Sequence, residues 1–396
     1  MRRTFEFFAV VTPGLEALSE QELERSGAKV SEISHGGVAF SADLLGACAL
    51  HLNARTLGRI WLRLGDFRAR SFPDLYNGVA AIDWPRHLAV GTPVRIKASA
   101  TASRLNHVGR IQDTAMAGIR HHLALASEGP SEGSQAILVR MEQDRCTVSL
   151  DMSGDHLHKR GYREATGKAP LRETMAAALL QWAGWDGTTP LLDPMCGVGT
   201  LLIEGAWMAS GRAPGLGRSF AFERWPRYDQ YGWRRLKAEA EAAASPAAEA
   251  APAISPSAEA TPAGEAASPR PLILGADRDP EAISAAIANV ARAGLADAIS
   301  LTVADVSDLT PPEGVPPGLI VCNAPYGERL GSPKALASVY KRLGKAARQF
   351  EGWRLLLLHT RPELRQQFEG ACARKPSDKL IFHHGGLKVT AALYRI

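Results

Sequence analysis

The feature that most constrains the fold is a strand, a glycine turn and a helix that follow one another in residues 191–204. Residues 191–193 predict a buried strand, Gly197 and Gly199 permit a tight turn, and a helix is expected from Thr200. In a parallel sheet such a turn lies at the carboxyl edge, where the backbone can approach a nucleotide. An ordinary turn with two glycines is the competing interpretation, and the acidic strand end disfavours it.

The rest of the chain predicts an α/β protein with an α+β front half. After residue 170, helices alternate with short apolar strands, which is typical of a mostly parallel sheet with crossover helices. These strands are expected at residues 191–193, 272–277, 299–304, 319–323 and 354–359, with an antiparallel hairpin at 380–382 and 387–396. Before residue 170, strands are expected at 5–11, 38–40, 93–98, 135–141 and 145–151, and helices at 15–26 and 109–125.

Charge is distributed unevenly along the chain. Residues 238–269 are mostly Ala, Pro, Ser and Glu, with five glutamates and no basic residue, which predicts a disordered insert that can be removed. The net charge of +5 for 396 residues becomes +10 without it. Between residues 55 and 125, ten arginines and Lys97 face four aspartates, a net charge of +7. That window predicts a phosphate-binding surface, with a merely solvated basic face as the alternative.

Composition and cysteine spacing exclude several classes of protein. With 45% hydrophobic and 22% charged residues the chain is an ordinary globular protein, not a collagen, a coiled coil or a wholly disordered chain. No apolar run reaches the ~20 residues of a membrane span and no signal peptide is apparent, so a cytoplasmic protein without a membrane partner is expected. The five cysteines never form CxxC, so we expect buried thiols and no metal site.

Acidic residues are expected at the ends of three successive strands. Asp193 closes the first strand of the sheet, and Asp277 closes the second, where a carboxylate can accept hydrogen bonds from both hydroxyls of a ribose. Asp305 follows the third, where it could accept a hydrogen bond from the exocyclic amine of adenine, with a cap or turn as the alternative. Asp279 precedes Pro280, so it is expected to cap a helix rather than bind a ligand.

The fourth strand ends in a turn suited to holding an amine. Residues 323–326 read NAPY, so the side-chain carbonyl of Asn323 and the backbone carbonyl of Ala324 would lie on a turn stiffened by Pro325. Two such acceptors can hold an NH2 group and direct its lone pair at a methyl donor. Tyr326 would stack on a base removed from its helix. A structural turn that caps the strand is the alternative.

These motifs resemble a known family. Residues 193–204 (DPMCGVGTLLIE) and 323–330 (NAPYGERL) resemble the class I S-adenosylmethionine-dependent methyltransferases that modify exocyclic amines. Within that class, the chain is most similar to the THUMP-domain RNA methyltransferases, and among these to the bacterial 23S rRNA guanine-N2 methyltransferases of the RlmL type. The stretches that carry this closer resemblance are residues 34–40 (SHGGVAF), 74–79 (DLYNGV), 149–163 (SLDMSGDHLHKRGYR) and 169–178 (APLRETMAAA).

The resemblance implies a domain plan and a reaction. It implies a ferredoxin-like segment at 1–43, a THUMP RNA-binding domain at 44–155, a linker at 156–172 and a Rossmann-like methyltransferase domain at 173–396, which contains the insert. The implied cofactor is S-adenosylmethionine, the implied partner is RNA of the 23S type, and the implied product is N2-methylguanosine.

The resemblance also implies roles for single residues. Asp305 would contact the adenine of the cofactor and Asp277 its ribose, while the methionine and sugar part would be lined by Asp193, Met195, Gly197 and Gly199. The guanine would be held by Asn323, the Ala324 carbonyl and Tyr326. The commoner motif has Pro in place of Ala324, but the expected contact is a backbone carbonyl, which Ala preserves.

Three other functions stay open at this point. A tRNA guanine-N2 methyltransferase would carry the same two motifs. A DNA adenine-N6 methyltransferase shares the chemistry of the NAPY turn, although the basic front half of the chain disfavours it. An inactive RNA-binding assembly factor is the third alternative, and the intact set of Asp193, Asp277 and Asn323 disfavours it.

Overall fold

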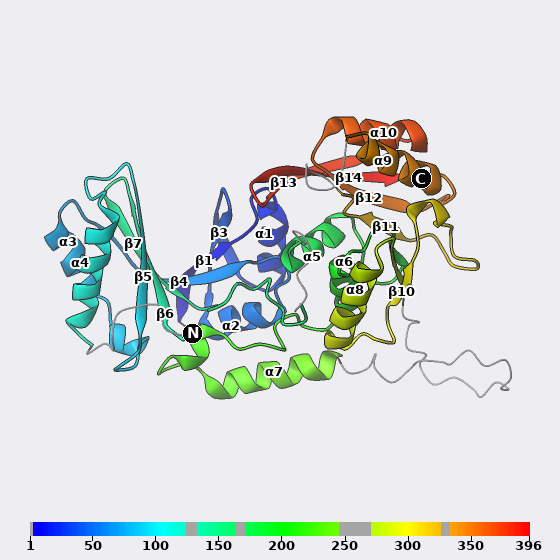
Figure 1. Cartoon of the computed structure of the whole chain (residues 1–396). Helices are drawn as coiled ribbons and strands as arrows, with labels where there is room; N and C mark the ends of the chain where they lie inside the picture. The colour runs from blue at the N-terminus through cyan, green and yellow to red at the C-terminus, as the bar shows by residue number, and fades with distance from the viewer. Residues whose placement is uncertain (1–2, 124–132, 164–170, 245–270, 326–332) are drawn as a thin grey trace. The chain divides into compact units, whose positions relative to one another are not determined.

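The chain passes more than once between two folded units (Figure 1). The computed structural model describes residues 3–123, 133–163, 171–244, 271–325 and 333–396. The first unit comprises residues 1–11, 19–158 and 217–237, and the second comprises 12–18, 159–216 and 238–396. A segment near the start of the chain therefore belongs to the unit that contains its end.

The first unit is built on one mixed sheet with the strand order β2-β3-β1-β4-β7-β6-β5. Its strands are β1 (Thr4–Val10), β2 (Lys29–Ser34), β3 (Gly37–Asp43), β4 (Arg59–Arg68), β5 (Val94–Thr101), β6 (Gln135–Glu142) and β7 (Arg145–Asp151). Neighbours are antiparallel except β5 and β6, which are parallel. Helices that lie wholly or mainly in this unit include α1 (Glu16–Arg25), α2 (Leu44–Asn53), α3 (Phe72–Ala80) and α4 (Val108–Arg120).

Strand β4 joins the two halves of this sheet. Residues 59–62 pair with β1, and residues 61–68 pair with β7. The expected α+β character is therefore confirmed, in one continuous sheet, while the division into segments at residue 43 stays a prediction. Sequence patterns did not indicate β2 or β4, because β2 is largely exposed and a bulge between Arg63 and Gly65 breaks the alternation of β4.

The second unit is the expected α/β domain, with the strand order β10-β9-β8-β11-β12-β14-β13. Its strands are β8 (Leu191–Asp193), β9 (Ile273–Asp277), β10 (Ser300–Val303), β11 (Leu319–Cys322), β12 (Arg354–His359), β13 (Asp378–His384) and β14 (Leu387–Arg395). The first five are parallel to one another, β14 is antiparallel to β12, and the expected antiparallel hairpin is formed by β13 and β14. Its helices are α5 (Glu173–Trp182), α6 (Thr200–Ala209), α8 (Pro280–Arg292), α9 (Pro333–Ala347) and α10 (Pro362–Cys372).

Both faces of this second sheet are covered. Helices α5, α6 and α8 pack with one set of strand side chains, and α9 and α10 pack with the other. Alternate residues of β12 divide between the two cores, since Leu356 and Leu358 face the first and Leu355 and Leu357 the second. This two-sided burial explains why the strands read as continuous apolar runs.

Helix α7 (Gln230–Ala244) corrects the predicted start of the low-complexity insert. Residues 238–244 were expected to be disordered, and they are helical. Their sequence, AEAEAAA, contains only strong helix formers, so the helix that begins at Gln230 continues through it. Residues 245–270, which hold the rest of the predicted insert, lie outside the described residues.

Residues 12–18 pack within the second unit. The Pro13 carbonyl accepts a hydrogen bond from the N–H of His383 at 3.0 Å, and Leu15, 3% exposed, belongs to the core of α5 and α6. Gly14 has φ +96°, and a Cβ there would lie 2.2 Å from the carbonyl oxygen of Ile381. Only glycine allows the segment to approach β13 this closely.

We expect Gly14→Ala to lower the free energy of unfolding by about 3 kcal/mol, because it combines a left-handed backbone with a collision against β13. Urea unfolding and hydrogen exchange of β13 amides would measure the loss. Gly27→Ala is the matched control, since Gly27 has φ +79° and no atom within 4 Å of its added Cβ. Equal losses in the two variants would contradict the close approach.

Candidate active site

The structure brings the predicted strand-end residues to one edge of the second sheet. Asp193 and Asp277 are the last residues of β8 and β9, Asn323 follows β11 directly, and Asp305 lies two residues beyond β10. These strands are parallel, so their carboxyl ends share an edge. The strand order reverses between β8 and β11, which is where open α/β sheets usually bind nucleotides.

The glycine loop is fastened to the neighbouring strand and helix. Gly197 and Gly199 have φ +53° and +83°, and α6 begins directly after them. The N–H of Gly197 donates to the Asp277 carboxylate at 3.0 Å, and the buried Asn289 side chain of α8 donates to the Val198 carbonyl at 3.1 Å. Sequence reasoning missed Asn289, because a contact between residues 91 positions apart leaves no local pattern.

Asp193 is a buried acid. It is 2% exposed, and its carboxylate accepts a hydrogen bond from the N–H of Met195 at 3.1 Å. Burial raises the pKa of Asp193 to about 8, and the nearby Asp277 adds to the rise, while the Met195 N–H acts against it. The carboxyl group therefore keeps its proton near neutral pH unless a cation approaches it.

Two other predicted acids serve as caps. Asp279 accepts a hydrogen bond from the N–H of Glu281 at the start of α8, so its expected role is confirmed. The Asp305 carboxylate accepts bonds from Ser307 and forms an ion pair with Arg342 of α9, at 2.7 and 2.8 Å. The hydroxyl of Ser307, and then Arg342, hold the pKa of Asp305 below its usual range. The role of Asp305 in binding adenine stays a prediction, and its carboxylate is already bonded to Ser307 and Arg342.

The turn after β11 presents an unpaired acceptor. The Oδ1 atom of Asn323 is buried and has no hydrogen-bond partner within the described part of the chain. Ala324 is fully buried and Pro325 partly so, while Tyr326 lies outside the described residues. A buried carbonyl without a donor costs about 1–3 kcal/mol, so this oxygen is suited to a ligand that brings an N–H.

A buried cluster of charged residues lies beside the glycine loop. The Arg160 guanidinium lies 3.5 Å from Glu204 of α6, and that of Arg163 lies 3.3 Å from Glu173 of α5. Arg163 also donates to the hydroxyl of Thr200, the first residue of α6, at 2.7 Å. Burial raises the pKa of Glu173 to about 7, while Arg163 acts against the rise. No local sequence pattern marks these four side chains, which link residues 160–163 to the helix that follows the loop.

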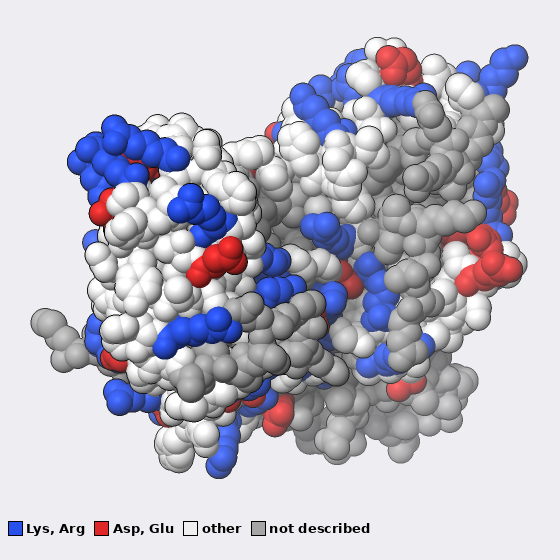
Figure 2. All heavy atoms as spheres, turned by 60° about the vertical axis from the view of Figure 1, so that its left-hand side comes forward, with Lys and Arg blue, Asp and Glu red and all other residues white. Residues whose placement is uncertain are grey.

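The basic window of the first unit is only partly a surface. Arg59 is buried and paired with Asp151, so its charge is internal. Other members are exposed, and Figure 2 shows that Lys and Arg outnumber acidic residues on the face turned to the viewer. The exposed basic residues of the window are Arg68, Arg70, Arg95, Lys97, Arg104, Arg110 and Arg120.

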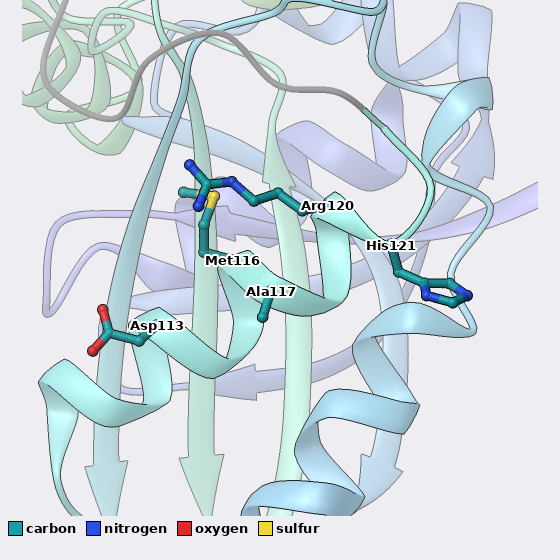
Figure 3. A pocket seen from close by; sticks show the side chains of 5 residues that line it. All are labelled: Asp113, Met116, Ala117, Arg120 and His121. Carbon is teal, nitrogen blue, oxygen red and sulfur yellow. The ribbon is translucent and has the colours of Figure 1, made fainter.

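An open pocket of about 580 Å³ lies on the outer side of α4 (Figure 3). Its lining side chains all come from one helix and its end, namely Asp113, Met116, Ala117, Arg120 and His121. His121 is fixed by a hydrogen bond to the hydroxyl of Tyr76 on α3, at 3.3 Å. The pocket lies in the first unit and does not include any of the strand-end residues.

All five cysteines are buried free thiols, as expected. Among the described residues, no group of His, Cys, Asp and Glu side chains could hold a metal ion. None of the helices in the described ranges is both long enough and apolar enough to cross a bilayer.

Two family profiles match this chain. The profile of the RMKL-like methyltransferase domain matches residues 160–389, which is more than half of the sequence. The chain belongs to this methyltransferase family. The profile of the RlmL ferredoxin-like domain matches residues 6–61, so it ends within β4. The expected order of a ferredoxin-like domain followed by a Rossmann-like methyltransferase domain is confirmed.

Solved structures of similar proteins cover nearly the whole chain of this methyltransferase. SMU.472, described as a methyltransferase and complexed with SAH, is 29% identical over 100% of this chain and 99% of its own, with a TM-score of 0.85. A protein from Listeria monocytogenes, described as a predicted N6-adenine-specific DNA methylase, is 28% identical over 98% of this chain and 96% of its own, with a TM-score of 0.83. TrmN from Thermus thermophilus shares the fold at 17% identity, over 99% of each chain, with a TM-score of 0.71.

The buried state of Asp193 predicts a pH-dependent stability. The folded chain holds the Asp193 proton up to about pH 8, whereas an unfolded chain releases it near 3.8, so the free energy of unfolding falls as pH rises between these values. Asn does not titrate, so the free energy of unfolding of Asp193→Asn should exceed that of the wild type by at least ~1 kcal/mol at pH 8, and by less at pH 5. Urea unfolding at both pH values measures this difference.

Asp186→Asn is the control for this measurement. Hydrogen bonds from Thr188 hold the pKa of Asp186 below its usual range, and the side chain is exposed. Its replacement should therefore give no gain at high pH. A flat difference between wild type and Asp193→Asn across the pH range would contradict the buried, protonated carboxyl.

Proposed function

We propose that this methyltransferase transfers a methyl group from S-adenosylmethionine to the exocyclic N2 amine of a guanine in 23S ribosomal RNA, in the cytoplasm. The observation that carries the proposal is the buried Oδ1 of Asn323, which has no hydrogen-bond partner within the described residues and is followed by the fully buried Ala324. Both residues lie at the sheet edge where β8 and β9 end in Asp193 and Asp277. The site therefore offers acceptors for an amine next to acids for a nucleoside. The resemblance to RlmL-type enzymes supports the choice of guanine.

The residues of the glycine loop fit the cofactor. The proposed contacts are the Asp277 carboxylate, which would accept hydrogen bonds from a ribose, the Asp193 carboxyl, which would accept them from a cationic amine, and the loop of Met195, Gly197 and Gly199, which would line the methionine and sugar part. A Cβ added at Gly197 would meet no atom within 4 Å, so the loop is open on that side. Bound S-adenosylmethionine supplies an electrophilic methyl group.

The chain's own contribution is to position and orient the amine. Asn323 Oδ1 and the Ala324 carbonyl each accept a hydrogen bond from the N2 amine, which leaves the nitrogen lone pair directed away from both acceptors. Pro325 restricts the turn that holds these oxygens. Methylation leaves a positively charged N2, which then loses one proton to solvent water, because amide carbonyl oxygens are too weakly basic to keep it. Orientation of this kind can supply most of the lowering of the barrier, without a covalent enzyme intermediate.

RNA binding is assigned to the first unit. The predicted THUMP segment, residues 44–155, contains the exposed arginines of the basic window, which can neutralise phosphates without reading sequence. Arg110 stacks over the Phe72 ring, with its guanidinium carbon 3.9 Å from the ring centre, so part of this surface is ordered. The choice of base would then be made at the turn that holds Asn323.

A DNA adenine-N6 methyltransferase is the second candidate. The observation that favours it is the Listeria monocytogenes protein, which is described as such an enzyme and is 28% identical. Adenine also presents an exocyclic amine, so Asn323 and Ala324 could hold it in the same way. A tRNA guanine enzyme is a further alternative with the same site, and only the nucleic acid separates it from the first proposal.

Asn323→Ala should lower kcat/KM for RNA methylation about a hundredfold or more, because the amine loses one of the two acceptors that orient it. Cofactor affinity should stay within about twofold, since Asn323 is not among the proposed cofactor contacts. Tritium transfer from S-adenosylmethionine and calorimetry measure the two quantities. Asn53→Ala on α2, an exposed asparagine, is the control and should behave as wild type. Full activity of Asn323→Ala would refute the proposed role.

The RNA substrate can be identified in a deletion strain. Nuclease digestion and mass spectrometry of its RNA should show that one N2-methylguanosine is missing from 23S rRNA and returns with the wild-type gene. Loss from tRNA alone would replace the substrate with tRNA. Loss of N6-methyladenine from DNA, with no change in either RNA, would favour the second candidate.

A further inference from the structure

A buried histidine lies at the end of β12, beside the strand that leads to Asn323. His359 is the last residue of β12 and is 3% exposed. Neither of its ring nitrogens has a hydrogen-bond partner among the residues that the structure describes. Buried side-chain nitrogens are nearly always paired in native proteins, so two unpaired nitrogens on one ring need an explanation.

The register of the sheet places His359 on the strand next to the one that leads to Asn323 and Ala324. Strands β11 and β12 are parallel, and the last pair between them joins Cys322 to Leu357. Two residues farther along each strand, Ala324 and His359 occupy corresponding positions. Leu357 and Ala324 pack in the same core, with α9 and α10, so the alternation of β12 directs His359 toward this side of the sheet.

The ring is neutral in these surroundings. Burial lowers the pKa of His359 to about 4, and the positive charge of Arg365 on α10 adds to this, while Glu369 on the same helix acts against it. The backbone of Arg361 also acts to raise the pKa of His359, but it does not meet the geometric criteria for a hydrogen bond to either ring nitrogen. Lys379 of β13 is a further positive group nearby. A neutral imidazole offers one N–H donor and one acceptor.

We infer that His359 contacts the target base and donates a hydrogen bond from its ring N–H to the O6 carbonyl of guanine. This inference rests on the proposed function and concerns the same candidate site. Guanine carries the N2 amine, the N1–H group and O6 along one edge, so a base whose N2 lies at Asn323 and Ala324 extends O6 beyond them. Enzymes that act on a flipped base commonly read this edge with side-chain hydrogen bonds.

The contact can be tested by changing the base and the enzyme together. Two RNA oligonucleotides would carry the mapped target position as guanine or as 2-aminopurine, which keeps the N2 amine and lacks O6. Under single-turnover conditions, the wild type should prefer guanine by about tenfold to a hundredfold, the value of one buried hydrogen bond. His359→Ala should lose this factor on guanine and none on 2-aminopurine, so that the preference disappears.

Two further variants separate the contact from packing. His359→Asn retains a short N–H donor and should recover part of the activity on guanine. Cys372→Ala removes a buried side chain from the same core and should lower stability without changing the preference. The inference is overturned if His359→Ala keeps the wild-type preference for guanine over 2-aminopurine, which includes an equal loss of rate on both RNAs. It is also overturned if His359→Ala and His359→Asn methylate the guanine RNA at the same rate. Absence of transfer to guanine RNA by the wild type would instead overturn the proposed function itself.

Discussion

The parallel pairing of β8 with β9 on one side and β11 on the other is the constraint on which the rest of the structure depends. Backbone hydrogen bonds fix Asp193 opposite Gly275 and Leu192 opposite Ile320, so the strand ends cannot slide relative to one another. Packed helices cover both faces, and a slip by one residue would turn every buried side chain to the wrong core. The ligand-type residues at this edge are therefore held by the whole sheet and not by their own loops.

The buried charges near the glycine loop serve position more than stability. Two arginines and two glutamates share a site from which water is nearly excluded, and the desolvation of such groups offsets most of their attraction. Removal of one partner would still cost several kcal/mol, because an uncompensated charge would remain. The cluster fixes the position of residues 160–163 relative to the start of α6. The proposed cofactor loop and the start of α6 are thus held by contacts from β9, from α8 and from residues 160–163.

Local patterns predicted the strands and loops of the second sheet, because Asp193, Asp277 and Asn323 each end an apolar run and Gly197 and Gly199 mark a turn within a few residues. What local patterns missed depends on pairing across long distances. The charged cluster joins residues 160–163 to 173 and 204, and the burial of His359 follows from its place in the sheet. The sequence of residues 238–244 has high helix propensity, but the same charged, Ala-rich composition also predicts disorder when it is read together with residues 245–269.

The basic front half of the chain does not by itself distinguish RNA from DNA substrates. The Listeria monocytogenes protein, which is described as a predicted DNA adenine methylase, matches 98% of this chain. A similar front half therefore occurs in a protein with that description too. The proposed amine acceptors would not distinguish guanine from adenine either, since any exocyclic NH2 can donate to two carbonyl oxygens. Selection must then come from groups that face the rest of the base. In the described part of the second unit, His359 is a buried polar side chain at the end of β12 whose ring nitrogens have no hydrogen-bond partner, so the proposed contact with O6 would let the base edge decide between guanine and adenine.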